Sequence, residues 1–163
     1  MDYSVLILTI GIPGSGKTTW AKKYLKEHPN GTVIISSDEI RKELTGTEQC
    51  IDPTQNELIH HETRKRAKEI LQSSSELRKK WGTWPTVIID STNVDIEEWE
   101  AYKQLGSSVM IAKIFDTPPE QAFNNLQNRD RKVPLNIIQW KWETLLKNSP
   151  YLSKYFNLIV KEF

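Results

Sequence analysis

The chain has 163 residues, of which 37% are apolar and 26% charged. These values are typical of one globular domain, here 1–163, and exclude a disordered chain. Its 22 lysines and arginines nearly balance 21 aspartates and glutamates, giving a net charge of +1. That balance excludes a strongly basic nucleic-acid binder but not a local basic groove. A single cysteine, Cys50, excludes an internal disulfide framework and a cysteine-based zinc site.

Apolar runs of strand length alternate along the chain with longer amphipathic stretches. The runs are Tyr3–Ile10, Thr32–Ser36, Thr86–Asp90, Ser108–Phe115 and Phe156–Val160. The helical patterns cover Lys17–Lys26, Asp38–Leu44, Gln55–Trp81, Asp95–Leu105, Pro119–Asn128 and Pro134–Lys147. Because the runs lack polar alternation, we expect strands buried on both faces, as in a parallel sheet. The alternation predicts an α/β fold with helices on both faces of the sheet. Loops are expected at Thr45–Pro53 and Gly82–Pro85.

The first apolar run, 3–10, lacks a basic lead-in and is far too short to cross a bilayer. We therefore expect a cytoplasmic protein with no membrane partner. The run leads directly into the segment GIPGSGKT (11–18), which matches the pattern G-x-x-x-x-G-K-[ST]. This segment lies between an expected strand and an expected helix, which is the context that a phosphate-binding loop requires.

The chemistry of this loop follows from its residue types. Glycines let successive backbone N–H groups point inward around an anion, and the helix N-terminus adds the positive end of its dipole. Lys17 supplies a positive charge for the β- and γ-phosphates, and the Thr18 hydroxyl can ligate Mg²⁺. We therefore predict a nucleoside triphosphate and Mg²⁺ as ligands. The expected nucleotide-binding residues are Gly11, Pro13, Gly14, Ser15, Gly16, Lys17, Thr18 and Thr19.

The second expected strand runs into IISSDEIR (34–41). Ser36 and Glu39 have the spacing of a capping box, which places Asp38 in a first helical turn and Arg41 on the same face. Because carboxyl ends of parallel strands face one crevice, both side chains should lie near the phosphate loop. There Asp38 could orient an attacking hydroxyl, and Arg41 could hold a phosphate. The alternative is an ordinary acidic first turn with an ion pair.

The third expected strand ends in VIIDSTN (87–93). A carboxylate after a buried strand, here Asp90, could support Mg²⁺ together with Thr18. Ser91, Thr92 and Asn93 could bind a substrate, and Asn93 is also a plausible cap for the following helix.

The segment NRDRKVP (128–134) carries three cations between two expected helices. We expect it to form a small basic lid that closes over the nucleotide and places an arginine on the γ-phosphate. The alternative is a solvated basic helix end that the helix dipole favours.

Four segments in this order resemble the polynucleotide 5′-hydroxyl kinase family, which includes kinase modules of phage and bacterial RNA-repair enzymes. They are TIGIPGSGKTTWAKKYL (9–25), VIISSDEIRKEL (33–44), VIIDSTNV (87–94) and NRDRKVP (128–134). The resemblance implies the P-loop kinase fold with sheet order 2-3-1-4-5. It implies transfer of the γ-phosphate of ATP to the 5′-hydroxyl end of RNA or DNA.

Site roles are also implied by this resemblance. Lys17 and Thr18 would hold ATP and Mg²⁺, and Asp38 would engage the 5′-hydroxyl as general base. Arg41 would contact the acceptor phosphate, and Arg129, with Arg131 second, the donor phosphates. Several members carry a further arginine where this chain has Asn125. Kinases of this type can assemble, so the implied partners are a homo-oligomer or separate repair enzymes, a ligase or a phosphatase, in other chains.

Two other functions remain open. The same fold serves kinases of small-molecule hydroxyls in nucleosides, sugars or antibiotics, and it also serves non-catalytic NTP-binding switches. A nucleic-acid acceptor needs a basic approach, for which the charged stretch 55–81 is a candidate, although such stretches are usually solvated faces. His60 and His61 lack metal-site spacing. We expect Trp140 and Trp142 to pack in the core rather than to form a stacking platform.

Overall fold

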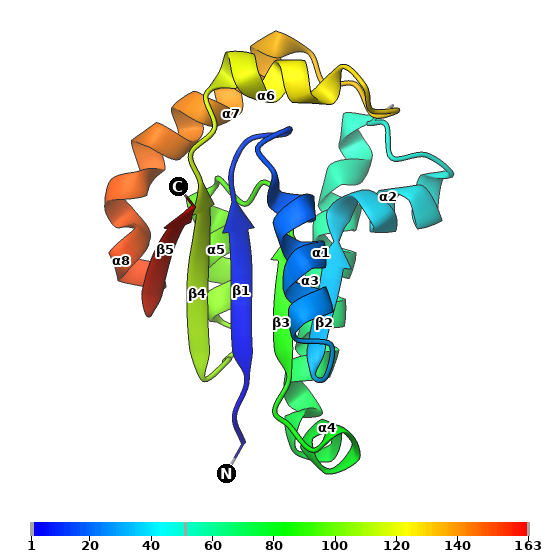
Figure 1. Ribbon diagram of the computed structural model, residues 1–163, viewed down its shortest axis with the longest axis vertical. Helices are drawn as coiled ribbons and strands as arrows, with labels where there is room; N and C mark the ends of the chain where they lie inside the picture. The colour runs from blue at the N-terminus through cyan, green and yellow to red at the C-terminus, as the bar shows by residue number, and fades with distance from the viewer. Residues whose placement is uncertain (1, 51, 163) are drawn as a thin grey trace.

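The computed structural model describes residues 2–50 and 52–162. Its parallel strands form one five-stranded sheet in the order β2-β3-β1-β4-β5 (Figure 1). The strands are β1 (Val5–Ile10), β2 (Thr32–Ser36), β3 (Thr86–Asp90), β4 (Val109–Phe115) and β5 (Leu158–Glu162). The predicted α/β class and strand order are thereby confirmed.

Helices cover both faces and one end of the sheet. They are α1 (Lys17–Glu27), α2 (Ser37–Thr45), α3 (Asn56–Gln72), α4 (Ser74–Trp81), α5 (Ile96–Lys103), α6 (Pro119–Leu126), α7 (Leu135–Asn148) and α8 (Leu152–Tyr155). Short 3₁₀ turns, η1 (Pro53–Gln55) and η2 (Ser149–Tyr151), precede α3 and α8. Across the described ranges 2–50 and 52–162, no helix is long and apolar enough to cross a membrane.

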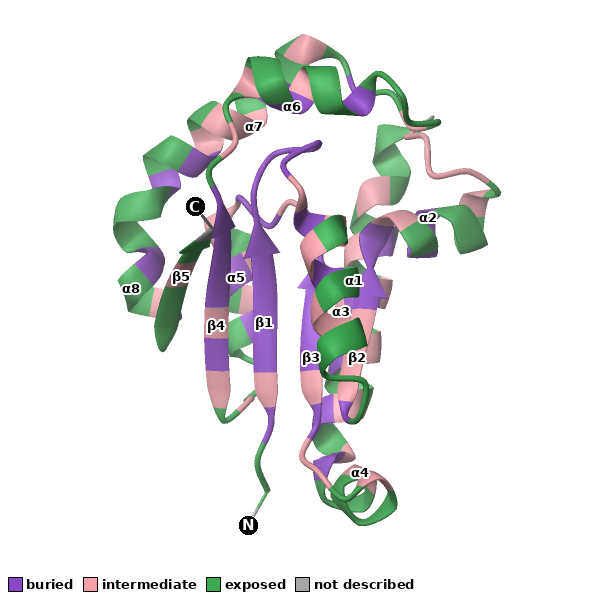
Figure 2. Ribbon diagram, viewed as in Figure 1, coloured by how far each residue is buried: buried purple, intermediate pink, exposed green. Residues whose placement is uncertain are grey.

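Two cores form because successive strand residues point to opposite faces of the sheet. Leu6 and Leu8 of β1 belong to a large cluster that includes buried residues of α3, α5, α7 and α8. Ile7, between them, packs with Ala21 of α1 in a smaller cluster. The sheet is therefore buried in its centre, while the outer helix surfaces stay exposed (Figure 2). This explains why the strand sequences lack polar alternation.

The prediction of one long helix over Gln55–Trp81 is wrong, because the structure has two helices there, α3 and α4, separated at Ser73. Three successive serines, 73–75, follow α3. Serine is unfavourable in the interior of a helix because its hydroxyl forms hydrogen bonds with the nearby backbone. The Ser73 N–H donates to the carbonyls of Glu69 and Ile70, which closes the first helix. The second helix then ends at Gly82, in the left-handed conformation typical of helix ends.

At the carboxyl end, the elements η2 and α8 were not predicted. Pro150 lies in the first turn of η2, where its missing N–H breaks no helical hydrogen bond. The chain therefore remains helical through η2 into α8. The last strand begins at Leu158, two residues later than the apolar run that suggested it.

Helices α6 and α7 arch over the carboxyl ends of the strands (Figure 1). Their buried side chains, including Ala122, Leu126 and Ile138, form a third core with Ile12 of the phosphate loop. This core holds the predicted lid segment over the same end of the sheet. The lid is also joined to the loop after α2, since Gln49 Nε2 donates to the Lys132 carbonyl at 2.8 Å and the Lys132 N–H donates to Gln49 Oε1 at 2.9 Å.

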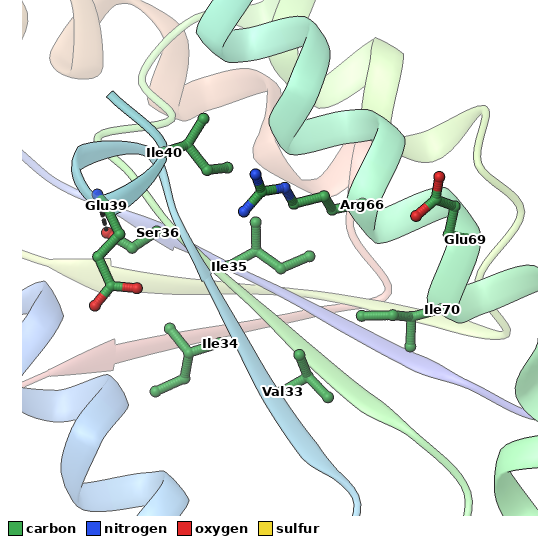
Figure 3. A pocket seen from close by; sticks show the side chains of 9 residues that line it. All are labelled: Val33, Ile34, Ile35, Ser36, Glu39, Ile40, Arg66, Glu69 and Ile70. Atoms are coloured by element: carbon green, nitrogen blue, oxygen red, sulfur yellow. Dashed lines mark hydrogen bonds between the residues drawn. The ribbon is translucent and has the colours of Figure 1, made fainter. Parts of the chain in front are cut away.

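A separate hollow of about 340 Å³ follows the edge strand β2 (Figure 3). Its wall combines apolar residues of β2 with Arg66 and Glu69 of α3. Arg66 is already bound there by Glu62 at 3.0 Å and by Glu43 at 2.6 Å. This hollow does not include residues of the phosphate loop, so it is distinct from the site described next.

Candidate active site

A cavity of about 730 Å³ opens at the carboxyl ends of the strands, beneath the arch of α6 and α7. It brings together ten of the residues that the sequence predicted. These are Pro13, Gly14, Gly16, Lys17, Thr18, Asp38, Arg41, Asp90, Arg129 and Arg131. Gly11, Ser15 and Thr19 were predicted for nucleotide binding but do not line the cavity, and Thr19 is exposed on α1.

The phosphate loop is held in the curled shape that an anion nest requires. Gly14 and Gly16 have φ angles of 83° and 97°, a region that other residues rarely adopt. Lys17 begins α1 and folds back, so that Nζ donates to the Ile12 carbonyl at 2.7 Å. Burial lowers the pKa of Lys17 from 10.5 to about 8, against the opposing charges of Asp90 and Asp38. A buried cation with one backbone partner is well placed to bind a phosphate.

The loop is also fixed from above by α6. A Cβ on Gly14 would lie 2.2 Å from the carbonyl oxygen of Ala122. Asn125 Nδ2 donates to the Gly14 carbonyl at 3.0 Å. The Asn125 amide therefore binds the phosphate loop itself.

We expect Gly14→Ala to lower both stability and nucleotide affinity, because a clash with backbone must displace the loop. The loss of unfolding free energy should be about 2–5 kcal/mol, the sum of the ranges for overpacking and for left-handed strain. ATP affinity should fall at least about tenfold, as measured by calorimetry. Gly46→Ala is the matched control, because Gly46 has φ 86° but no atom within 4 Å of the new Cβ. Equal effects from both variants would show that the contact with α6 is unimportant.

The predicted magnesium ligands lie together. The Thr18 hydroxyl donates to Asp90 Oδ2 at 2.7 Å, directly beside Lys17. Burial raises the pKa of Asp90, whereas the Thr18 hydrogen bond and the charge of Lys17 lower it. A hydroxyl and a carboxylate are hard oxygen ligands, which Mg²⁺ prefers alongside phosphate oxygens and water. The residues present therefore fit this ion.

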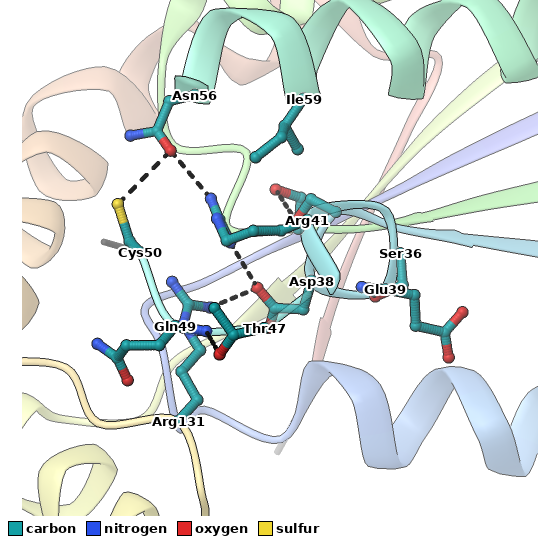
Figure 4. Close-up of polar contacts among 12 residues, drawn as sticks. Ser36, Asp38, Glu39, Arg41, Thr47, Gln49, Cys50, Asn56, Ile59 and Arg131 are labelled. Carbon is teal, nitrogen blue, oxygen red and sulfur yellow. Dashed lines mark hydrogen bonds and ion pairs between the residues drawn. The ribbon is translucent and has the colours of Figure 1, made fainter. Parts of the chain in front are cut away.

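Asp38 lines the cavity, and Figure 4 shows it in contact with Arg41 and Arg131. The Ser36 hydroxyl caps α2 by accepting from the Glu39 N–H at 3.3 Å, which places Asp38 in the first turn as predicted. Arg41 Nη1 donates to Asp38 Oδ1 at 3.0 Å, and Arg131 Nη1 donates to the same oxygen at 2.6 Å. Within the described part of the chain, the other oxygen, Oδ2, remains available to a hydroxyl group.

Arg41 is itself held in place by the start of α3. Its Nη2 donates to Asn56 Oδ1 at 3.0 Å, and the residue is only 8% exposed (Figure 4). One contact to the Asp38 carboxylate and one to the Asn56 amide oxygen thus fix the guanidinium at the cavity wall. Asn56 was not singled out from the sequence, since it falls in the first turn of the helix expected over Gln55–Trp81 and belongs to no motif there.

The two lid arginines differ in their contacts. Arg131 donates to Asp38, whereas Arg129 is exposed at the cavity rim. The sequence placed Arg129 first for the donor phosphates. Arg129 and Arg131 lie in an irregular segment between α6 and α7, which has no helical or strand period, so spacing alone cannot say which arginine points inward.

Asn93 was suggested as a substrate ligand or a helix cap, and the cap assignment is wrong. The residue that precedes α5 is Asp95. Asn93 is buried with φ 47°, and its Nδ2 donates to the Thr9 carbonyl at 2.8 Å. The Gly11 N–H also donates to the Thr92 carbonyl at 3.0 Å. This segment therefore ties β3 to the start of the phosphate loop.

The expectation that Trp140 packs in the core is also wrong. Its side chain is 55% exposed and lines the cavity, while Trp142 packs against the core that contains Ile12. Lys141, half-buried, lines the cavity beside Trp140. Helical spacing could have separated the two tryptophans, because Trp142 shares a face with the buried Ile138, four residues earlier, and Trp140 does not.

Comparison with known proteins gives matches of several kinds. Residues 6–148 match a family described as an AAA domain. Human heterogeneous nuclear ribonucleoprotein U-like protein 2 is 30% identical over 93 residues, which are 55% of this chain and 12% of that protein. The mouse protein of the same name is 29% identical over a stretch of the same length. The chain thus spans a small part of the length of these curated relatives.

Solved structures share the fold at low sequence identity. A chain of the Pnkp1/Rnl/Hen1 RNA repair complex superposes with a TM-score of 0.74 and 19% identity, covering 93% of this chain and 47% of that chain. A gluconokinase from Sinorhizobium meliloti superposes with a TM-score of 0.57 and 11% identity, covering 99% of this chain and 83% of that one. The expected fold is confirmed by both. The chain belongs to the AAA domain family and has the fold of a P-loop kinase.

Proposed function

We propose that the protein is an ATP-dependent kinase of 5′-hydroxyl ends of RNA or DNA. The observation that carries the proposal is the Asp38–Arg41 pair, which lies in one cavity with Lys17 and Thr18. A carboxylate that can aim a hydroxyl, next to a fixed arginine that can bind a phosphate, suits an acceptor that carries both groups. A nucleotide switch needs neither of them on this side of the loop.

The transfer follows from these positions. The 5′-hydroxyl oxygen attacks the γ-phosphorus of ATP, a new O–P bond forms, and the bond to the β-phosphate oxygen breaks to release ADP. Asp38 orients the hydroxyl and accepts its proton. Lys17 and the N–H groups of the phosphate loop stabilise the charge on the phosphates. Arg129 and Arg131 add positive charge from the lid. Mg²⁺, held by Thr18 and Asp90, would neutralise charge on the phosphate oxygens when bound.

Similarity to named proteins supports nucleic acid as the acceptor class. One structural neighbour is part of an RNA repair complex, and the curated relatives are named as ribonucleoproteins. The Pnkp1/Rnl/Hen1 complex also makes separate repair enzymes our proposed partners for this chain. A small-molecule kinase is the second candidate, because the gluconokinase fold covers nearly the whole chain.

An acceptor panel distinguishes the two candidates. Purified protein is incubated with Mg²⁺ and ATP labelled at its γ-phosphate, with 5′-hydroxyl oligoribonucleotides, oligodeoxyribonucleotides, nucleosides, gluconate and shikimate. We expect label on the oligonucleotides, removable by a phosphatase. Label on the small molecules alone would overturn the proposal, and ATP binding without any transfer would favour a switch.

Arg41→Ala should reduce the use of acceptors that carry a phosphate. The value of kcat/KM for a nucleoside 3′-monophosphate should fall about 10- to 100-fold, the value of a charge-assisted hydrogen bond, while KM for ATP stays within about twofold. Arg66→Ala is the control, because Arg66 lies on α3 in an ion pair outside the cavity. Unchanged acceptor kinetics in Arg41→Ala would contradict this role.

A further inference from the structure

Helix α7 presents an exposed aromatic side chain and a cation to the acceptor side of the cavity. Ile137, Trp140 and Lys141 are spaced three and four residues apart, so they share one face of α7, and all three line the cavity. Ile137 is 38% exposed and Trp140 is 55% exposed. The buried face of the same helix carries Ile138 and Leu145 instead. The core therefore does not account for Trp140.

The charge of the cavity differs from that of the whole chain. Six of its lining residues are lysine or arginine and four are aspartate or glutamate, although the chain as a whole is nearly neutral. Two of the four acidic groups, Asp38 and Asp90, are engaged by Arg131 and Thr18. A surplus of positive charge in a cavity favours a polyanionic occupant.

Lys141 contributes to this surplus next to the exposed ring. Its Nζ lies 5.5 Å from the centroid of Trp140. Burial lowers the pKa of Lys141, the charge of Asp95 opposes that effect, and the positive charges of Arg131 and Arg41 lower the pKa further. Arg41 and Arg131 therefore act on the same region as Lys141. A phosphate placed there would relieve the repulsion between these cations.

The opposite wall comes from α3, where Asn56 and His60 share a face and line the cavity. Asn56 fixes Arg41, and His60 Nδ1 lies 3.1 Å from Glu98 Oε1. Glu98 is one of the two carboxylates whose charge raises the pKa of Lys141, and its contact with His60 joins α5 to α3 at this wall. Residues of both α3 and α7 therefore line the cavity that contains Asp38.

We propose that Trp140 and Lys141 form a subsite for the second nucleotide of the acceptor strand, with the base stacked on Trp140 and a backbone phosphate at Lys141. This inference rests on the proposed function and adds to it a preference for a strand over a mononucleotide. An aromatic ring next to a cation is the combination by which proteins bind single strands without reading their sequence. Arg41 binds the first acceptor phosphate, and Trp140 and Lys141 of α7 bind the next nucleotide.

The test compares two acceptors, a nucleoside 3′-monophosphate and a 5′-hydroxyl trinucleotide. In Trp140→Ala, kcat/KM for the trinucleotide should fall about tenfold, while the value for the monophosphate changes less than about twofold. Trp140→Phe should restore most of the loss, because a ring remains. Lys141→Ala should show the same selectivity. Leu146→Ala and Lys147→Ala are controls on the same helix, since both residues are exposed and lie outside the cavity.

The outcomes separate the subsite from the function. Equal losses on both acceptors, or no loss on either, would overturn the subsite while leaving the kinase activity intact. Failure of the unmodified protein to phosphorylate any oligonucleotide would instead overturn the proposed function. In that case, fluorescence anisotropy of a labelled trinucleotide still decides the subsite: equal affinity in Trp140→Ala and in the unmodified protein rejects it.

Discussion

Asp38→Asn should reduce phosphate transfer about 10²- to 10⁴-fold, the usual contribution of a positioned general base. The carboxamide keeps the shape of the side chain and can still accept from Arg41 and Arg131, but it cannot take a proton from the attacking hydroxyl. ATP binding should stay within about twofold, or tighten slightly, because a negative charge near the phosphates is removed. Single-turnover transfer and calorimetric titration with ATP measure the two effects separately.

The neighbouring residue provides the control for this prediction. Glu39 belongs to the same helical turn but is exposed and does not line the cavity (Figure 4). Glu39→Gln changes the charge of α2 by the same amount and should leave transfer within about twofold. Transfer by Asp38→Asn above a tenth of the unmodified rate would show that Asp38 is not the base.

The local features of the phosphate loop and α2 could be predicted because short-range rules fix them. A strand, a glycine-rich turn and a helix specify the nest around Lys17. The cap at Ser36 specifies where α2 begins, and three residues of helix then bring Arg41 to Asp38. The crevice rule for parallel sheets placed these side chains beside Asp90. Each inference used a few neighbouring residues and one topological rule.

The remaining parts of the site depend on contacts across long stretches of chain. Arg131 binds Asp38 over a separation of 93 residues, and Gln49 binds Lys132 over 83. Trp140 is exposed because the turn of α7 that faces the cavity is determined by where Ile138 packs against Ile12. Contacts such as these follow from the packing of the arch, which no local pattern encodes. Trp140 was assigned to the core from its aromatic side chain alone, although helical spacing separates it from Trp142.

Lys17→Met should abolish nucleotide binding and at the same time stabilise the nucleotide-free protein near pH 7. The folded-state pKa of about 8 lies below the ordinary value of 10.5. Keeping Lys17 charged in the folded protein therefore costs free energy at pH 7, of order 3 kcal/mol. Methionine has a similar length and no charge, but it leaves the Ile12 carbonyl without its donor. The expected gain in unfolding free energy is thus about 1–3 kcal/mol, measured by urea titration.

The lowered pKa of Lys17 also predicts how the stability of the unmodified protein depends on pH. Between about pH 8 and pH 10.5 the unfolded chain keeps a proton on Lys17 that the folded protein has lost, so the stability of the unmodified protein should rise with pH in this window. The difference between Lys17→Met and the unmodified protein should therefore be largest near pH 7 and shrink as the pH approaches 10. Lys23→Met, on the exposed face of α1, should change neither stability nor ATP affinity. A variant Lys17→Met that is less stable than the unmodified protein near pH 7 would show that the buried charge is already compensated before ATP arrives.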